Sequence, residues 1–241
     1  MDQGTAPDPA TWSLRHRGPA HDVSHRCLDA QRAARPRRRL ARLLGADPLH
    51  PDAATWYRGA LDERRVGGIL TALGDGWRGL HAVPRGGGDS GIDHLVVGPP
   101  GVFTITSGIA SAELEARVAS RSLTRATGVP VGAAAIVVDP GNRPDVPAAV
   151  TVVPAGRLLR HLRGLPAVLG PDLAASIARA AEEWTTWQPF GIDTAHSDPD
   201  DAFERLHREV IRARVRRAGW QVAALVGVTA PVAAIVSGIV A

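Results

Sequence analysis

Lysine is absent from this chain of 241 residues, and all 28 of its basic residues are arginine. Mechanisms that need a lysine side chain, such as Schiff-base formation or phosphate binding by a P-loop lysine, are therefore excluded. A single cysteine, Cys27, excludes an intramolecular disulfide and a zinc site built from cysteines. Apolar residues make up 44% of the chain against 22% charged residues, and this balance predicts a folded core.

Positive charge is concentrated near the N-terminal end. The net charge is +4 at pH 7, and residues 1–45 hold nine arginines against four aspartates, so the rest of the chain is close to neutral. Because residues 1–45 are rich in Pro, Ala, Arg and His and show little periodicity, we predict a basic, disordered segment there. Its arginine-rich part, residues 35–42, could bind phosphate-rich partners such as nucleic acid.

Apolar residues become periodic after Trp56. Val66, Ile69, Leu70 and Leu73 follow helical spacing. Apolar runs bounded by glycine and proline predict strands at residues 77–83, 92–97, 102–106, 133–138 and 151–153. Further helices are expected at residues 112–127, 158–162 and 173–187. This order predicts an α/β domain over residues 46–190, with a mixed central sheet flanked by helices.

The C-terminal end carries no charged side chain after Arg217. We predict a linker and a charged juxtamembrane helix over residues 191–217 and a transmembrane helix over residues 218–241. A helix of the 22 residues from Trp220 onward would be about 33 Å long, close to the thickness of a bilayer's apolar layer.

Features flanking this apolar run indicate its orientation. Arg212, Arg214, Arg216 and Arg217 precede it, and an aromatic residue stands at its start. The sequence therefore predicts a single-pass protein of the cell membrane with most of its mass in the cytoplasm. An alternative is a soluble structural domain whose C-terminal helix packs in an oligomer interface, since Pro231 would remove one helix hydrogen bond.

Two segments of the α/β region resemble a known family. Residues 59–67 read GALDERRVG and residues 91–103 read GIDHLVVGPPGVF, and the likeness extends over about residues 55–187. These segments resemble the nuclease-related domain (NERD) family. The resemblance implies a restriction-endonuclease-like core of the PD-(D/E)XK type, in which two strand acids and a lysine assemble a magnesium site for phosphodiester hydrolysis.

The resemblance places the family's site on four positions of this chain. Glu63 matches the helix acid and Asp93 the first strand acid, so both are candidate catalytic residues and Mg²⁺ ligands. Thr106 stands at the second acid position and Gly108 at the lysine position, and neither supplies the expected group. An arginine cannot replace the lysine in proton exchange because its pKa exceeds about 12.

Nearby residues offer a partial replacement. Glu113 and Glu115 could approach Asp93 from the following helix, although an exposed glutamate in the first helical turn is the commoner arrangement. The same reasoning gives Glu63 a purely structural role in a first turn. His94 follows Asp93 directly and should point to the opposite face of its strand.

We therefore expect a membrane-anchored NERD-domain protein with a degenerate, inactive nuclease site and no cofactor, which acts by binding nucleic acid or protein. The alternative is an active Mg²⁺-dependent nuclease that uses Glu63 and Asp93.

Overall fold

The computed structural model describes residues 13–34, 38–85, 91–139, 146–187 and 199–239, with the side chains of residues 225–239 left out of the description. The chain forms two compact units. Unit 1 comprises Met1–His25 and Tyr57–Asp198, and unit 2 comprises Arg26–Trp56 and Pro199–Ala241. The boundaries fall inside two helices, α1 (His21–Arg32) and α3 (Pro51–Leu70).

Unit 1 contains a five-stranded sheet and the helices that cover it. The strands are β1 (Arg78–Val83), β2 (Ile92–Gly98), β3 (Gly101–Thr106), β4 (Ala133–Val138) and β5 (Val150–Val153). The helices beside α1 and α3 are α4 (Ile109–Thr127), α5 (Leu158–Gly164), α6 (Pro171–Glu182) and α7 (Trp184–Trp187). Short 3₁₀ turns complete the unit: η2 (Leu14–His16), η3 (Thr71–Leu73) and η4 (Ala155–Arg157).

The sheet is mixed, with its strands in the order β1-β2-β3-β4-β5. The first three strands form an antiparallel meander, and β4 and β5 continue the sheet in parallel. Antiparallel neighbours need only a short turn, whereas the parallel pair β3–β4 needs a crossover, which α4 provides. The prediction of an α/β domain with a mixed sheet flanked by helices is confirmed.

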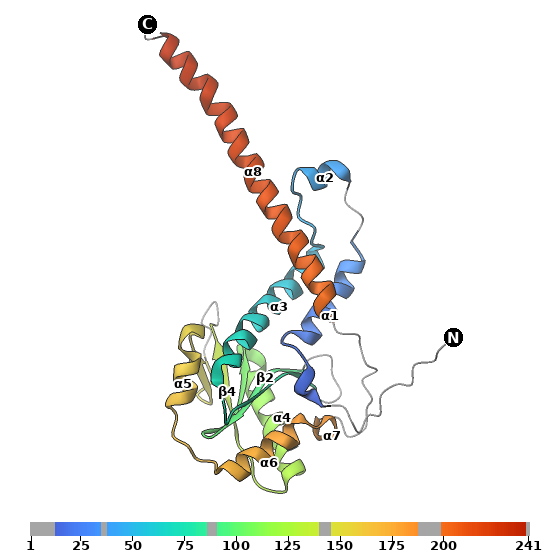
Figure 1. Ribbon diagram of the computed structural model, residues 1–241, viewed down its shortest axis with the longest axis vertical. Coiled ribbons are helices and arrows are strands. Elements are labelled where there is room, and N and C mark those ends of the chain that lie inside the picture. Colours follow the sequence, from blue (N-terminus) through green and yellow to red (C-terminus); the bar gives the residue numbers. More distant parts are fainter. Residues whose placement is uncertain (1–12, 35–37, 86–90, 140–145, 188–198, 240–241) are drawn as a thin grey trace, which may run out of the picture. The chain divides into compact units, whose positions relative to one another are not determined.

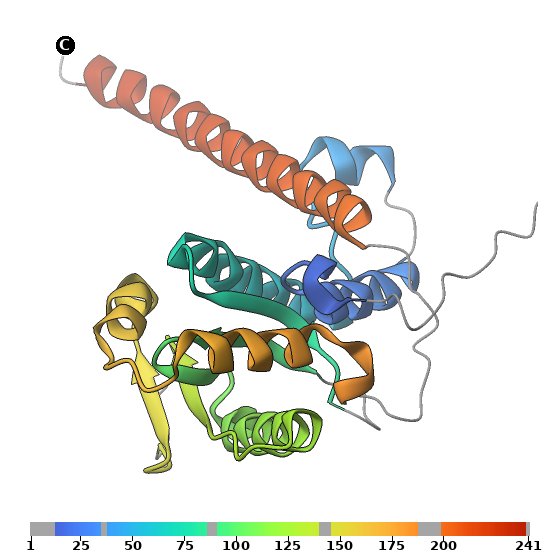
Figure 2. The same cartoon turned by 60° about the horizontal axis from the view of Figure 1, so that its bottom comes forward.

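Each face of the sheet is buried under its own helical layer (Figure 2). On one face, Val66 and Leu70 of α3 and Leu158 of α5 pack with Val96 and Ile105. On the other face, α4, α6 and α7 contribute apolar residues that pack with Leu80, Leu95 and Val97. Burial on both faces explains why β4 is a continuous apolar run rather than an alternating one.

Unit 2 is built around α8 (Asp200–Ile239), a single helix of 40 residues, together with α2 (Arg39–Leu43) (Figure 1). The N-terminal half of α8 has one apolar stripe at helical spacing: Phe203, Leu206, Val210 and Ala213 are all buried. Cys27 and Ala53 are also buried in this unit, and the Cys27 thiol donates to the Ala53 carbonyl oxygen at 3.7 Å.

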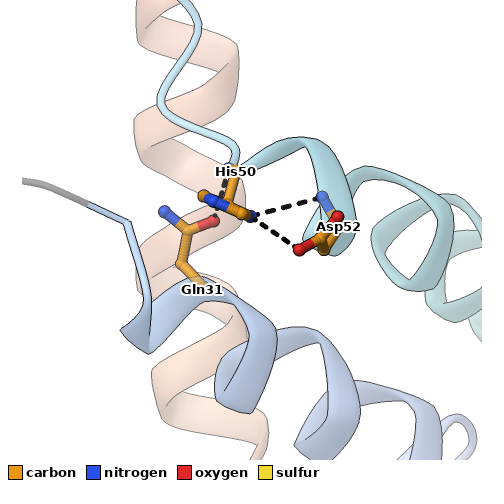
Figure 3. A network of polar contacts seen from close by, with 3 residues as sticks. All are labelled: Gln31, His50 and Asp52. Carbon is orange, nitrogen blue, oxygen red and sulfur yellow. Dashed lines mark hydrogen bonds and ion pairs between the residues drawn. The ribbon is translucent and has the colours of Figure 1, made fainter.

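A polar network holds the segment between α2 and α3 against α1 (Figure 3). The Gln31 side chain donates to the Pro48 carbonyl oxygen at 2.8 Å and accepts from the His50 backbone N–H at 2.9 Å. His50 in turn precedes α3, and its Nδ1 accepts from the Asp52 backbone N–H at 3.3 Å. This bond satisfies one of the backbone donors that every helix leaves unpaired at its start.

The predicted disorder of residues 1–45 differs from the structure, in which residues 13–34 and 38–45 contain η2, α1 and α2. Leu14, Ala20 and Cys27 are fully buried, so this segment orders itself by tertiary packing despite its polar composition. The remainder of that segment, residues 1–12 and 35–37, lies outside the described residues.

At the C-terminus, one helix replaces the two predicted segments, because α8 continues from the charged part into the apolar part. Within the described part of the chain, no helix is both long enough and apolar enough to cross a membrane. The side chains of residues 225–239 and all of residues 240–241 lie outside this description. The transmembrane helix over residues 218–241 stays a prediction.

Candidate functional site

Asp93 lies on β2 at a point where the sheet is interrupted. The β1–β2 ladder pairs His81 with His94 and Val83 with Ile92, and between them Ala82 has a positive φ of 47°. The β2–β3 ladder begins one residue later, at His94 and Ile105. Strand alternation places Asp93 on the same face as Leu95, which is the face that α4 covers.

Thr106 holds Asp93 from the neighbouring strand. Its Oγ1 donates to Asp93 Oδ2 at 2.6 Å and accepts from the Gly108 backbone N–H at 3.1 Å. Gly108 is the N-cap residue of α4, so this hydroxyl connects the end of β3 to the start of the helix. Thr106 and Gly108, the positions at which the resemblance implies an acid and a lysine, thus form a turn with Asp93.

Burial raises the pKa of Asp93 above its ordinary value of 3.8. Hydrogen bonds from the Thr106 hydroxyl and the Ser107 backbone, together with the positive charge of Arg85, act in the opposite direction, and the Asp22 carboxylate adds to the rise. Asp93 is therefore a half-buried carboxyl group that accepts hydrogen bonds from a side chain and a backbone group of the same chain.

Glu115 of α4 is the second acid at this point. Its side chain is only 2% exposed, and burial followed by the charge of Asp93 raises its pKa to about 8. It accepts hydrogen bonds from the Ser111 side chain and the Asp93 backbone, while its Oε2 has no hydrogen-bond partner among the described residues. At neutral pH the protonated form dominates.

Glu113 behaves differently, because it is part-exposed and lies 4.0 Å from Arg117 on the same helix. Neither glutamate lies in the first turn of α4, so the prediction of a first-turn glutamate is wrong for both. Glu115 lies two residues beyond Glu113, about half a turn around the helix, and is buried.

An ion pair from the N-terminal part of unit 1 adjoins these acids. Arg17 Nη2 lies 2.5 Å from Asp22 Oδ1, and the Arg17 side chain is 7% exposed. The Asp22 carboxylate lies close to Gly91, where an added Cβ would be 3.2 Å from its Oδ2. The network therefore brings two arginines, Arg17 and Arg85, close to the acids Asp22 and Asp93.

Glu63 does not lie on the face of the sheet that carries this network. It lies about three turns into α3, is 8% exposed, and belongs to the helical layer opposite α4. The interpretation of Glu63 as a first-turn acid is therefore wrong. The structure brings Asp93, Thr106 and Gly108 together and leaves Glu63 on the other side of the sheet.

The face that α3 covers carries a histidine pair. His81 Nδ1 and His94 Nδ1 are 2.9 Å apart, so one ring donates to the other. Burial, followed by the charge of His81, lowers the pKa of His94 to about 3, and burial also lowers the pKa of His81. His94 is therefore neutral at pH 7, and it points away from Asp93 as its position in the strand predicts.

The residues at Asp93 do not match the magnesium ligand set that the resemblance implies. Mg²⁺ requires oxygen ligands in a near-octahedral arrangement. Here the Thr106 hydroxyl donates its hydrogen to Asp93, so this position offers a neutral oxygen where the implied site has a carboxylate. In the described ranges, no three side chains of His, Cys, Asp or Glu are grouped so that they could hold a metal ion.

Sequence reasoning did not identify Arg17, Asp22 or Arg85 as parts of this site. Arg17 and Asp22 fall in the segment with little apolar periodicity, and Arg85 precedes a glycine-rich loop. The only local signal for the first two is the spacing of Leu14, Ala20 and Cys27, which the structure buries. Their nearness to Asp93 results from tertiary packing.

Comparisons with family models, with characterised protein sequences and with solved structures return no match for this chain.

Proposed function

We propose that this chain is a membrane-anchored, nuclease-related protein whose α/β unit acts by binding rather than by cleaving phosphodiester bonds. The order of elements in unit 1 supports the relationship: a helix, an antiparallel three-stranded meander, a crossover helix and a parallel strand. That order fits the core which the sequence resemblance implies.

The hydrogen bond between Thr106 and Asp93 carries the proposal. A PD-(D/E)XK site needs a second carboxylate at this position, and here a hydroxyl donates to the remaining acid at 2.6 Å. The lysine position is occupied by Gly108, and no lysine elsewhere in the chain could substitute for it. The polar network is then a structural element that links β2, β3 and α4.

Membrane attachment rests on the C-terminal run. Arg212, Arg214, Arg216 and Arg217 lie on α8 immediately before a segment without charge, and Trp220 follows them. Arginines on the cytoplasmic side and an aromatic residue at the interface are the usual flanks of a spanning helix. Unit 1 is then held on the cytoplasmic side of the cell membrane.

The surface of unit 1 offers a ligand an apolar groove of about 410 Å³ beside β3 and α6. Phe103, Val131, Leu169 and Leu173 line it, and Val168 at its rim is 69% exposed. An apolar groove favours a protein segment over a nucleic acid, whose phosphates need basic side chains.

A cleavage assay tests the loss of catalysis. The detergent-solubilised full chain is incubated with single- and double-stranded DNA and RNA in Mg²⁺ or Mn²⁺, beside Asp93→Asn. We expect no cleavage above that of the variant. A double variant, Thr106→Glu with Gly108→Lys, restores the family's residue types. An added Cβ at Gly108 would lie 3.4 Å from Ser111 Oγ, which is ordinary van der Waals contact.

One observation favours a second candidate, a nuclease that uses Asp93 with Glu115 in place of Glu63. The two carboxyl groups are close enough for the charge of Asp93 to raise the pKa of Glu115. Cleavage by the unmodified chain that both Asp93→Asn and Glu115→Gln abolish would establish this candidate and overturn the binding proposal. Glu63→Gln serves as the control, since Glu63 lies on the other face of the sheet.

A further inference from the structure

Arginines gather in a groove between α2 and α8 in unit 2. The groove has a volume of about 440 Å³ and is lined by Arg42 of α2 and by Arg205, Arg208, Glu209, Arg212, Ala213 and Arg216 of α8. The α8 arginines recur at intervals of three and four residues, so they share one side of the helix. The groove thus presents five guanidinium groups against one carboxylate.

Contacts between α8 and the backbone of the α2 segment form this groove. Arg216 Nη1 donates to the Arg42 carbonyl oxygen at 3.2 Å, Arg217 Nε to that of Gly45 at 3.2 Å, and Trp220 Nε1 to that of Leu43 at 2.9 Å. The acceptors are two carbonyl oxygens at the end of α2, those of Arg42 and Leu43, and that of Gly45 just beyond it. The α2 segment is therefore fixed against the last charged turn of α8.

Gly45 makes this close approach feasible. Its φ is +73°, and an added Cβ would lie 2.5 Å from the Ala213 carbonyl oxygen and 2.5 Å from the Arg217 backbone nitrogen. Only glycine combines this backbone conformation with this separation. Gly45 therefore allows the α2 segment to pack closely on α8, which places Arg42 beside the arginines of α8.

The arginines of α8 place like charges close together along one side of the helix. Arg208, Arg212 and Arg216 follow one another at intervals of four residues, a spacing at which like charges destabilise a helix. Guanidinium groups match phosphate geometry and donate two parallel hydrogen bonds to it. A groove with this composition is complementary to a phosphate group.

Exposed apolar side chains border the groove at one end. Leu40, Leu43 and Leu44 of the α2 segment are 71%, 57% and 56% exposed, and Trp220 is 49% exposed. Because the Trp220 indole bonds to Leu43, these side chains lie at the start of the apolar run of α8. Arg42 and Arg216 lie within about one helical turn of that point.

We propose that the arginine groove binds the phosphate headgroup of an anionic phospholipid while the leucines of the α2 segment enter the acyl region beside Trp220. This inference rests on the proposed membrane anchor. The interfacial layer of a bilayer is several ångströms thick, so Arg42, Arg212 and Arg216 reach headgroup phosphates when Trp220 lies at the interface. Each basic residue at this level raises the affinity for anionic lipids by about fivefold at most.

Quenching of tryptophan fluorescence tests the inference. The full chain is reconstituted into phosphatidylcholine vesicles that contain a minor fraction of either brominated phosphatidylserine or brominated phosphatidylcholine. The Trp220 signal is obtained as the difference from Trp220→Phe. We expect stronger quenching by the serine lipid. Arg42→Gln with Arg212→Gln should reduce that preference about tenfold.

A matched control removes the same two charges elsewhere. Arg121→Gln with Arg214→Gln changes an exposed arginine of α4 and one of α8 that does not line the groove. In this variant the serine lipid should still quench Trp220 more strongly than the choline lipid. Equal loss in both variants would mean that overall charge, and not the groove, attracts the lipid, and would overturn the inference.

The remaining outcomes separate the inference from the anchor. A chain that enters neither vesicle contradicts both, whereas a chain that enters both and is quenched equally by the two lipids contradicts the headgroup site alone. Competition by glycerophosphoserine or inorganic phosphate would show that a free phosphate is sufficient. A DNA duplex could also reduce the quenching by the serine lipid. If the Arg42→Gln, Arg212→Gln variant no longer showed this effect of DNA, the arginines would be assigned to nucleic acid instead.

Discussion

The Thr106 hydroxyl is at once a donor to Asp93 and an acceptor from Gly108. Thr106→Val keeps the shape of the side chain and removes both bonds, leaving the Asp93 carboxyl group with one partner fewer in a buried site. We expect the free energy of unfolding to fall by about 1–3 kcal/mol. Chemical denaturation of the detergent-solubilised chain measures this.

Thr106→Ser provides the comparison, because it retains the hydroxyl and loses only a methyl group. Its unfolding free energy should stay within about 1 kcal/mol of the unmodified chain. Equal destabilisation of both variants would mean that packing at Thr106, rather than its hydrogen bonds, stabilises the turn.

Glu115 makes stability depend on pH. Its pKa is about 8 in the folded chain, against an ordinary value of 4.5. Between these values the folded state binds more protons than the unfolded state, so the free energy of unfolding decreases as pH rises, by up to about 1.4 kcal/mol per pH unit. Glu115→Gln removes this dependence.

Glu115→Gln should therefore increase the free energy of unfolding only slightly near pH 4.5 and most strongly above pH 8. Denaturation curves recorded across this range for both proteins measure it, with Glu113→Gln as the control because Glu113 is part-exposed and lies near Arg117. A difference that stays constant with pH would contradict the protonation of buried Glu115.

At the scale of single residues, the sequence identifies Asp93 because the segment around it resembles a known family. It also places Thr106 and the pair Glu113 and Glu115 near Asp93, but it does not decide between the two glutamates. Glu115 is one of two glutamates close together on a helix, and only the packing of α4 determines which one is buried. Arg17 and Asp22 reach the site through contacts distant in sequence, which local patterns do not record.

Among the elements, the α2 segment depends most on a single residue. Gly45→Ala would place a Cβ against the backbone of α8 at a positive φ, and we expect it to release α2 from α8 at a cost of more than about 1 kcal/mol. Hydrogen exchange of the backbone amides of residues 39–46 measures the release.

Gly219→Ala is the matched change on α8, because an added Cβ there meets nothing within 4 Å. It should leave exchange in residues 39–46 unchanged and slightly favour the helix. Fast exchange in the chain with Gly45 intact would contradict a docked α2 segment.

Strands were more predictable than helix boundaries. The apolar runs locate all five strands within one or two residues, because glycine and proline mark their ends. The predicted helix over residues 173–187 is divided into α6 and α7 at Glu183, whose backbone is extended and pairs with Ser13. That pairing joins two distant segments, so no local pattern indicates the break.

For the whole molecule, attachment to the membrane is the property with the clearest test. Deleting residues 223–241 removes most of the uncharged run and leaves Trp220 with its bond to Leu43. The truncated chain should move from the membrane pellet to the soluble fraction, while the full chain should resist an alkaline carbonate wash. An unchanged distribution would contradict the anchor and favour a helix that packs in an oligomer.

The continuity of α8 from Asp200 to Ile239 has a rotational consequence. In an unbroken α-helix each residue turns the side chains by about 100°, so the arginine groove and every later position on α8 keep a fixed angular relation. One residue inserted after Gly219 would turn the groove by about 100° relative to the end of the helix, whereas seven would restore it to within about 20°. The C-terminal half of α8 therefore cannot rotate about the helix axis by itself. Any contact that fixes its rotation also fixes the direction in which the arginines face.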